Sequence, residues 1–277
     1  MLDKFIFENH LGQRFDGLSN GVFLNYNDLR DYSWSYDTIN NRISRFYMSA
    51  KNRKIPLVIK GKTDSEATAI KNRLHELAEA DIQAKIPSKI FVGDFYSKGY
   101  ITGSTKSNYL VNKRLCNIEL TLTSDDPAWY REQTHSFLPD SESSSSGVGG
   151  GHDFPYDYRY DYALSLAGRS IVCGTVGTNA FKLVIYGEVE NPSVVINGHI
   201  YAINGTVGRG ERLEIDSLNK TITLTTASGS NVNWFDKRGR DSYIFEPIPA
   251  GKATVSWLGS FGFDLTVIEK RSEPLWT

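Results

Sequence analysis

The chain has 277 residues and a formal net charge of −1, with 31 Lys and Arg against 32 Asp and Glu. Its 40% hydrophobic and 23% charged residues are typical of a globular protein and exclude wholesale disorder. Residues 1–140 carry 19 Lys and Arg against 17 Asp and Glu, a net +2, and residues 141–277 carry 12 against 15, a net −3. Neither half has the concentrated positive charge that sequence-specific nucleic-acid binding uses.

The N-terminal sequence MLDKFIFENH lacks the apolar stretch of a signal peptide. No segment approaches the ~20 apolar residues of a spanning helix. We therefore expect a protein made in a cytoplasm, without membrane association.

Residues 42–54 form a basic segment that contains no acidic residue. Its cations are Arg42, Arg45, Lys51, Arg53 and Lys54. This clustering indicates a contact surface, and Arg42, Arg45, Lys51 and Arg53 are the candidate interface residues. The solvated face of a hairpin would explain the same pattern equally well.

A helix is predicted to begin after Thr63, because Thr63 and Glu66 match the spacing of a capping box. Apolar residues then recur at intervals of three and four and form one stripe. The stripe consists of Ala67, Ile70, Leu74, Leu77 and Ala78. We expect this helix to pack on a sheet through that face.

Strands are predicted around the helix, at residues 55–61, 89–96, 100–104 and 116–123. A turn at Lys98-Gly99 is expected to join the second and third of them. The last strand alternates strictly and predicts a buried side made of Cys116, Ile118, Leu120 and Leu122.

Residues 141–151, SESSSSGVGGG, have the composition of a flexible linker. They predict a first domain over residues 1–140, a Ser/Gly linker over residues 141–152 and a second domain over residues 153–277.

The sequence DFPYDYRYDY follows the linker and alternates aromatic with mostly charged residues. If extended, it places Phe154, Tyr156, Tyr158, Tyr160 and Tyr162 on one face. A nucleic-acid stacking platform would need cations beside these rings, but three Asp accompany a single Arg. Carboxylates spaced four residues apart on a strand stand ~13 Å from each other, too far for a calcium site. We therefore predict an interdomain or intersubunit contact.

The second half reads as seven short strands separated by turn signals such as Asn197-Gly198 and Ser228-Gly229. The predicted strands are FKLVIYGEV, PSVVING, RLEID, TITLTT, YIFEPI, ATVSW and FDLTVIE. With no convincing helix among them, they predict a β-sandwich. The predicted fold class is thus mainly β with one helix.

Motifs that carry chemistry are missing from the sequence. The five His have no metal-ligand spacing, and no serine stands in a GxSxG context. Cys116 and Cys173 are far apart and are interpreted as two unrelated thiols. The glycine clusters lack the Lys-Ser/Thr of a phosphate loop. We expect no enzymatic activity, no catalytic residue, no cofactor and no metal.

Several passages, in this order along the chain, resemble the distal tail proteins (Dit) of siphophages and their prophages. They are IPSKIFVGDFYSKGYITGS, CNIELTLTSDDPAWY, DFPYDYRYDY, NPSVVINGHIY, GERLEIDSLNKTITL, IFEPIPAGKATVSW and FGFDLTVIEKRSEPLW. Each alone is only a strand or a turn, and it is their order over nearly the whole chain that carries the resemblance.

The resemblance implies an N-terminal β-sandwich with a flanking helix, which forms the belt of a hexameric ring, and a C-terminal galectin-like β-sandwich. Such rings join the tail tube to a tail-associated lysin or fibre and leave a channel for DNA ejection. Some also hold receptor-binding proteins. The implied location is the tail tip of a virion assembled in the bacterial cytoplasm.

A second hypothesis is a carbohydrate-binding module that contributes to adsorption on the host cell wall. Tyr201 and Trp234 are its candidate stacking residues. Trp257 lies within a predicted strand, so we expect it in the core instead.

Overall fold

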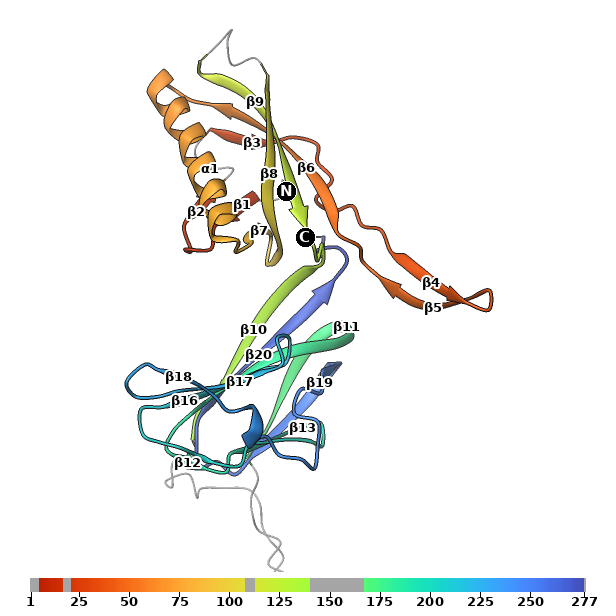
Figure 1. The fold of residues 1–277 in the computed structure, drawn as a ribbon, viewed down its shortest axis with the longest axis vertical. Coiled ribbons are helices and arrows are strands. Elements are labelled where there is room, and N and C mark those ends of the chain that lie inside the picture. Colours follow the sequence, from red (N-terminus) through yellow and green to blue (C-terminus); the bar gives the residue numbers. More distant parts are fainter. Residues whose placement is uncertain (1–4, 17–20, 108–112, 140–166, 277) are drawn as a thin grey trace, which may run out of the picture. The chain divides into compact units, whose positions relative to one another are not determined.

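The structure, a computed structural model, describes residues 5–16, 21–107, 113–139 and 167–276 (Figure 1). The chain folds into two compact units. Unit 1 comprises the residues up to Arg131 together with those from Lys270 onward, and unit 2 comprises Glu132–Glu269. The unit boundary therefore precedes the expected one at residue 140, and residues 270–277 belong with the first unit. The predicted linker, residues 141–152, lies outside the described residues.

The described part of unit 1 contains one helix, α1 (Asp64–Ala84), and antiparallel strands. The strands are β1 (Phe5–Glu8), β2 (Arg14–Asp16), β3 (Val22–Leu24), β4 (Ser35–Ile39), β5 (Arg42–Tyr47), β6 (Lys51–Lys60), β7 (Ser88–Val92), β8 (Phe95–Ser107), β9 (Leu115–Ser124) and the start of β10 (Trp129–Phe137). One sheet has the order β2-β1-β7-β8 and another the order β3-β6-β9-β8. Strand β8 belongs to both, and a bulge between Ile101 and Gly103 interrupts its pairing with β9. Because a bulge bends its strand, β8 can pass from one sheet to the other.

Helix α1 packs on β6 and β8 through the predicted stripe, which is buried along its whole length. The Oγ1 of Thr63 accepts a hydrogen bond from the Glu66 backbone N–H over 3.1 Å, so the predicted N-terminus is confirmed. The helix ends at Ala84, and Lys85 caps it in a left-handed conformation. The stripe joins both sheets in a single hydrophobic core.

The predicted turn at Lys98-Gly99 is wrong. The chain turns at Gly93-Asp94 instead, and β8 continues straight through Gly99. A Cβ at Gly99 would stand 2.5 Å from the Ser124 Oγ and 2.8 Å from the Leu122 Cδ1. Glycine is therefore needed here for the close approach of β9, not for a turn.

Unit 2 is a β-sandwich. Its strands are the rest of β10, β11 (Ala167–Tyr186), β12 (Val189–Glu190), β13 (Ser193–Ile196), β14 (His199–Ala202), β15 (Thr206–Val207), β16 (Arg212–Asp216), β17 (Thr221–Thr225), β18 (Asn231–Asn233), β19 (Ile248–Trp257) and β20 (Phe263–Arg271), with a short 3-10 helix, η1 (Phe235–Lys237). One sheet has the order β14-β13-β19-β11, and the other contains β20-β11-β16-β17-β18. Both sheets contribute to one core, for example through Val255 and Leu265.

Strand β11 pairs with β19 through its first part and with β20 and β16 through its second, so it links the two sheets of unit 2. The predicted turn at Asn197-Gly198 is confirmed, with positive φ at both residues. The predicted strand YIFEPI is wrong over residues 243–247, which form a turn closed by the Glu246 N–H and the Tyr243 carbonyl. Its apolar residues Ile244 and Phe245 are buried in that turn, which explains why they resemble a strand.

Candidate interaction surface

Strands β4 and β5 form a hairpin of their own, separate from both sheets of unit 1 (Figure 1). Its two-residue loop is Asn40-Asn41, and both residues have positive φ, 52° and 60°. This is the geometry of a type I′ turn, which asparagine tolerates well and which matches the twist of paired strands.

The register sorts the side chains of this hairpin onto two faces. Tyr36 pairs with Phe46 and Thr38 with Ile43, and since side chains alternate along β4, these four share one side. A register shift after Asp37 accommodates one extra residue in β5 and preserves this arrangement. We call this side the apolar face of the hairpin. The opposite side carries the pairs Asp37–Arg45 and Ile39–Arg42.

The apolar face is left uncovered by the residues that the structure describes. The exposed fractions of Tyr36 and Phe46 are 58% and 59%, and Ile43 is exposed as well. The rings of Tyr36 and Phe46 contact each other edge to face, with centroids 6.5 Å apart. A two-stranded hairpin alone is at best marginally stable in water. Its exposed apolar face is therefore a surface that needs a partner.

The predicted basic interface residues divide between surface and interior. Arg42 and Arg45 are exposed on the hairpin, and the guanidinium of Arg45 lies 5.5 Å from the Tyr47 ring centroid. Lys51 is half-buried and donates from Nζ to the Asp31 carbonyl over 3.0 Å.

Arg53 is buried, so its assignment to a surface is wrong. Its Nη2 donates to the Pro127 carbonyl over 2.7 Å and its Nη1 to the Ser97 Oγ over 3.2 Å, while the guanidinium lies 5.6 Å from the Trp129 ring centroid. Burial lowers the pKa of Arg53, an effect that Asp28 and Asp31 partly offset. Arg53 follows the alternation of β6, whose residues at the same parity form the core.

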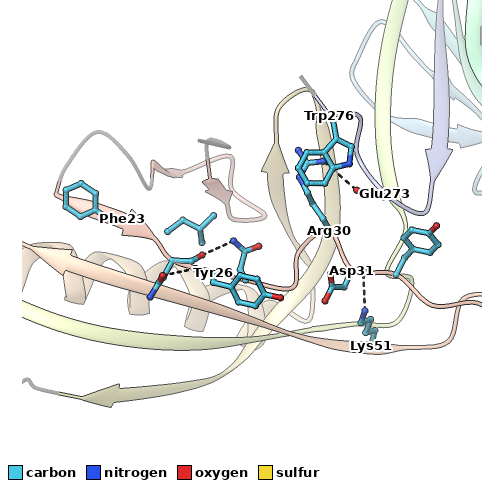
Figure 2. Close-up of a pocket in the computed structure, with 11 residues that line it drawn as sticks. Phe23, Tyr26, Arg30, Asp31, Lys51, Glu273 and Trp276 are labelled. Carbon is cyan, nitrogen blue, oxygen red and sulfur yellow. Dashed lines mark hydrogen bonds and ion pairs between the residues drawn. The ribbon is translucent and has the colours of Figure 1, made fainter. Parts of the chain in front are cut away.

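A groove of about 1020 Å³ lies beside the base of the hairpin (Figure 2). Its rings belong to Phe23, Tyr26, Tyr32 and Trp276, and Tyr26 and Trp276 are 89% and 76% exposed. Polar side chains complete the lining, among them Asp31 and Lys51. Sequence reasoning missed this groove because its residues come from two ends of the chain.

Arg30 holds the C-terminal segment in the wall of this groove. Its Nη1 donates to the Pro274 carbonyl over 2.9 Å, and its guanidinium lies 4.0 Å from the ring centroid of Trp276. Cation–π contact of this kind fixes the ring against the arginine and leaves the other ring face available. Contacts within unit 1 thus hold this wall of the groove in place.

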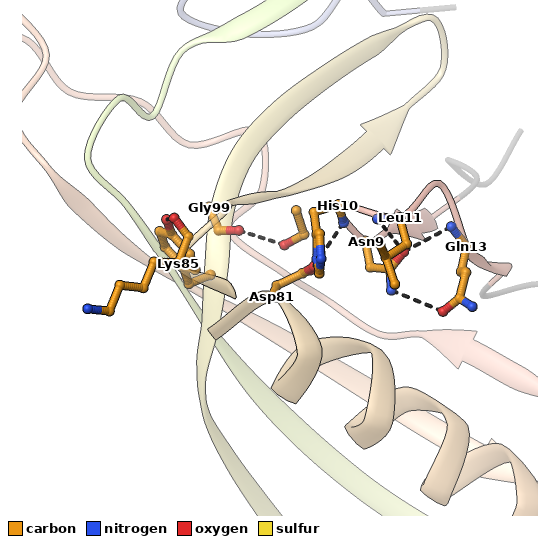
Figure 3. Close-up of polar contacts among 9 residues, drawn as sticks. Asn9, His10, Leu11, Gln13, Asp81, Lys85 and Gly99 are labelled. Atoms are coloured by element: carbon orange, nitrogen blue, oxygen red, sulfur yellow. Dashed lines mark hydrogen bonds and ion pairs between the residues drawn. The ribbon is translucent and has the colours of Figure 1, made fainter. Parts of the chain in front are cut away.

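A buried polar cluster ties the β1–β2 turn to the end of α1 (Figure 3). The Asp81 Oδ1 accepts from the His10 backbone N–H over 2.8 Å and lies 2.6 Å from the His10 Nδ1. Asn9 accepts backbone hydrogen bonds from Leu11 and Gln13 with its side-chain oxygen. These contacts all lie within the turn or at the helix end, so the role of the cluster is structural.

Asp126 accepts hydrogen bonds from the Tyr130 hydroxyl and, over 2.8 Å, from the Lys270 Nζ. Burial alone would raise the pKa of Asp126, but the hydrogen bonds from Lys270 and Tyr130, the charge of Lys270 and the backbone N–H of Ala128 together hold that pKa below its ordinary value. Burial and the same contact raise the pKa of Tyr130. This cluster joins the C-terminal strand to the turn before β10 and is also structural.

The saccharide candidates of unit 2 do not form a stacking surface. Tyr201 is buried, its hydroxyl donates to the Glu246 carbonyl over 2.7 Å, and burial raises its pKa. Trp234 is half-buried and packs against the hydrophobic core. Trp257 is buried, as expected, with its Nε1 donating to the Phe261 carbonyl over 3.1 Å. Tyr201 occupies a core position because alternation along β14 points it inward.

The residues of the predicted interdomain or intersubunit contact lie outside the described residues; they are Phe154, Tyr156, Tyr158, Tyr160 and Tyr162. Among the residues that the structure does describe, no group of three or more His, Cys, Asp and Glu is placed to hold a metal. Cys116 and Cys173 are buried free thiols. Within the same described ranges, no helix combines the length and apolar character needed to cross a bilayer.

No protein-family model and no curated protein sequence matches the chain. Solved structures do match, over both units. The fold is that of phage tail hub and baseplate proteins.

One such structure is the SPP1 Dit protein, described as a paradigm of the hub adsorption apparatus in phages that infect Gram-positive bacteria. It has a TM-score of 0.58 and 11% identity, with 98% of this chain and 100% of that chain covered. Two structures of the phage P2 baseplate in its activated conformation also match, each over 99% of this chain and 100% of that chain. The structure with calcium has a TM-score of 0.60 and 10% identity. The structure with strontium has a TM-score of 0.61 and 11% identity. The expected resemblance to distal tail proteins is thereby confirmed at the level of the fold.

Proposed function

We propose that the chain is a structural distal tail protein, a hub that assembles into a hexameric ring at the tip of a phage tail. The observation that carries the proposal is the fold match, which extends over 98% of this chain and the whole of the SPP1 Dit protein. A match that covers both units supports a common architecture and not merely a shared sandwich domain.

The uncovered apolar face of the β4–β5 hairpin supports self-assembly. A ring closes when one surface of a copy meets a different surface of the next copy at a rotation that returns to the start. Burial of apolar area supplies the energy at ~25 cal/mol per Å². Tyrosine and phenylalanine rings such as Tyr36 and Phe46 are side chains that interfaces favour.

In this role the ring joins the tail tube to a tail-associated lysin or fibre, holds receptor-binding proteins where these are present, and surrounds a channel for DNA ejection. The protein works without catalysis, by presenting surfaces to its neighbours. It is part of the virion, and assembly takes place in the cytoplasm of the host.

Negative-stain electron microscopy and native mass spectrometry of the purified full chain test the proposal. We expect rings with a central opening and a mass of six copies. A gold-labelled antibody against the chain should mark the tail tip of intact virions. A strictly monomeric chain at micromolar concentration, together with unlabelled tail tips, would refute the proposal.

A further inference from the structure

The groove of unit 1 presents four aromatic rings that are spaced apart along its lining (Figure 2). Tyr26 and Trp276 are the most exposed of them, and Phe23 and Tyr32 are each half exposed. Among the described residues, no two of these four rings contact each other. Separate rings with open faces suit a ligand that offers several flat apolar faces in succession. A small organic cation would instead need rings gathered into a cage.

Planar polar side chains accompany two of these rings. Asn25 directly precedes Tyr26, and Asp31 directly precedes Tyr32. The Asn25 Oδ1 accepts from the Tyr26 backbone N–H over 2.8 Å, and no described residue accepts from the Asn25 amide nitrogen. Lys51 binds the backbone carbonyl of Asp31, and the Asp31 carboxylate has no hydrogen bond or ion pair within the described ranges. The lining therefore offers a free donor and a free acceptor together with its rings.

The segment that carries these groups is fixed by contacts within unit 1. Leu29 is buried beneath it, and the Asp28 Oδ1 accepts from the Lys54 backbone N–H over 2.7 Å. The guanidinium of Arg30 lies against one face of the Trp276 ring. A site whose groups are already in place binds a ligand without the entropic cost of ordering them.

The charges of the groove lining cancel. Arg30 and Lys51 are its cations. Asp31 and Glu273 are its anions, and the other lining residues are neutral, so the formal charge is zero. A polyanion such as DNA or a phosphate-rich wall polymer would need an excess of cations. The lining thus favours a neutral ligand that can form hydrogen bonds.

The groove is poorly suited to a peptide bound as an added strand. Strand β3 contributes Phe23 and Leu24 to the lining and pairs only with β6 among the described strands. Strand addition needs a row of unpaired backbone groups. However, β3 has only three residues, and the next backbone N–H, that of Asn25, donates to the Pro56 carbonyl over 2.9 Å. Ring faces and side-chain groups, rather than backbone, are what this groove offers.

We infer that the groove of unit 1 binds a neutral saccharide chain. Sugar rings stack on Tyr26 and Trp276, because a sugar ring has a flat C–H face that packs on an aromatic ring. Sugar hydroxyls bond to Asn25 and Asp31, since a hydroxyl both donates and accepts. The volume of about 1020 Å³ leaves room for several sugar units. This inference goes beyond the proposed hub function and does not rest on it, because a single copy carries the whole site.

A glycan array probed with the full chain tests the inference. The array carries neutral oligosaccharides of glucose, galactose, rhamnose and N-acetylglucosamine, beside oligosaccharides that contain uronic acid or phosphate. We expect binding to at least one neutral oligosaccharide and weaker binding to the charged ones. Tyr26→Ala and Trp276→Ala should each weaken it by about tenfold or more, and Tyr26→Phe should bind like the wild type because the ring remains. Tyr36→Ala, which removes an exposed ring outside the groove, is the matched control and should change nothing.

The hydrogen bonds of the site are tested separately from the stacking. Asp31→Ala should weaken binding of the same oligosaccharide by about tenfold, because it removes a charged acceptor. Isothermal titration calorimetry measures the affinity. Glu76→Ala, which removes an exposed carboxylate of α1 outside the groove, is the control and should bind like the wild type.

Tryptophan fluorescence locates the ligand on the ring itself. The bound oligosaccharide should protect Trp276 from quenching by acrylamide, and this protection should be absent in Trp276→Phe. No binding to any neutral oligosaccharide, or binding that Tyr26→Ala and Trp276→Ala leave unchanged, would overturn the inference. If these two variants instead stop assembly and no oligosaccharide binds, the groove is a protein contact and the inference is equally wrong.

The mass of the assembled wild type separates this inference from the proposed function. Rings of six copies that bind no saccharide would sink the inference and leave the proposed function standing. A strictly monomeric chain that binds a neutral oligosaccharide through Tyr26 and Trp276 would do the reverse.

Discussion

Two pairs of neighbouring strands in this molecule have the same construction and opposite surroundings. In unit 2, β16 and β17 pair antiparallel, with Leu213 opposite Leu224 and Ile215 opposite Ile222, and all four side chains are buried. In unit 1, β4 and β5 pair antiparallel, with Tyr36 opposite Phe46, and both rings are more than half exposed. Both pairs have an apolar side, but within the described parts of the chain only that of β16–β17 is covered.

The two strand pairs are stabilised by different interactions. The side chains of β16–β17 join the core of the sandwich, so burial within the chain stabilises that pair. The β4–β5 pair has cross-strand contacts and a favourable turn, and such contacts contribute roughly 0.2–1 kcal/mol for each side-chain pair. None of the described residues of the chain covers its apolar face, so we expect the burial energy of that face to come from a second molecule.

Ile215→Ala should lower the free energy of unfolding by about 2–5 kcal/mol, because it leaves a cavity in a fully buried site. Denaturant unfolding of the full chain, monitored by circular dichroism, measures it. A loss below about 1 kcal/mol would mean that β16–β17 depends on the sandwich core no more than β4–β5 does.

Arg53→Ala should cost about 2–3 kcal/mol, because it removes a buried side chain and leaves the Pro127 carbonyl without its donor. Arg53→Met should recover part of this loss, since it restores volume without burying a charge. Arg42→Ala is the control from the same basic segment and should change the stability of the monomer by less than about 0.5 kcal/mol. Equal losses at both positions would contradict the assignment of one arginine to the core and the other to the surface.

Acid should weaken unit 1 through Asp126. Its pKa is lower in the folded chain than in the unfolded one, so its contribution is present above the unfolded pKa of 3.8 and is lost as the pH falls through the folded value. The side chain is 43% exposed, so solvent screening limits the contribution to less than about 1 kcal/mol. Stability measured between pH 5 and pH 2 should fall less steeply in Asp126→Asn than in the wild type. An unchanged slope would show that this cluster does not contribute.

Phe46→Ala should change the stability of the monomer by less than about 0.5 kcal/mol, because the ring is exposed and its ring contact is with Tyr36 of the same hairpin. The same substitution should abolish assembly at micromolar concentration. Thermal unfolding of a dilute sample and sedimentation of a concentrated one separate the two effects. If the substitution destabilised the monomer and left assembly intact, the Phe46 ring would stabilise its own chain and not a contact between copies.

The sequence predicts well the elements whose pattern is decided locally. The capping spacing at Thr63 and the stripe through Leu74 specify α1, and strict alternation from Cys116 to Leu122 specifies β9. In each case the side chains that carry the pattern are those that become buried, so periodicity and structure have the same cause.

Other features depend on neighbours that are remote in the sequence. Gly99 resembles a turn residue, but its role is set by Ser124 and Leu122 of the strand beside it. Tyr201 could stand on either side of its strand until the second sheet defines the interior. The groove could not be foreseen, because it needs Trp276 to lie near Arg30. The alternation around Asn40-Asn41 could have predicted the hairpin from the sequence. It resembles the alternation of any half-buried strand pair, so it could not have shown that the apolar face is exposed.

Hydrogen–deuterium exchange of residues 35–47 in the full chain tests the central claim most directly, namely that a second copy covers the β4–β5 hairpin. We predict slow exchange of these amides at assembling concentrations and fast exchange after dilution to the monomer, while the amides of β16–β17 stay protected at both. Fast exchange in the hairpin at every concentration, in a sample shown to be assembled, would contradict the account.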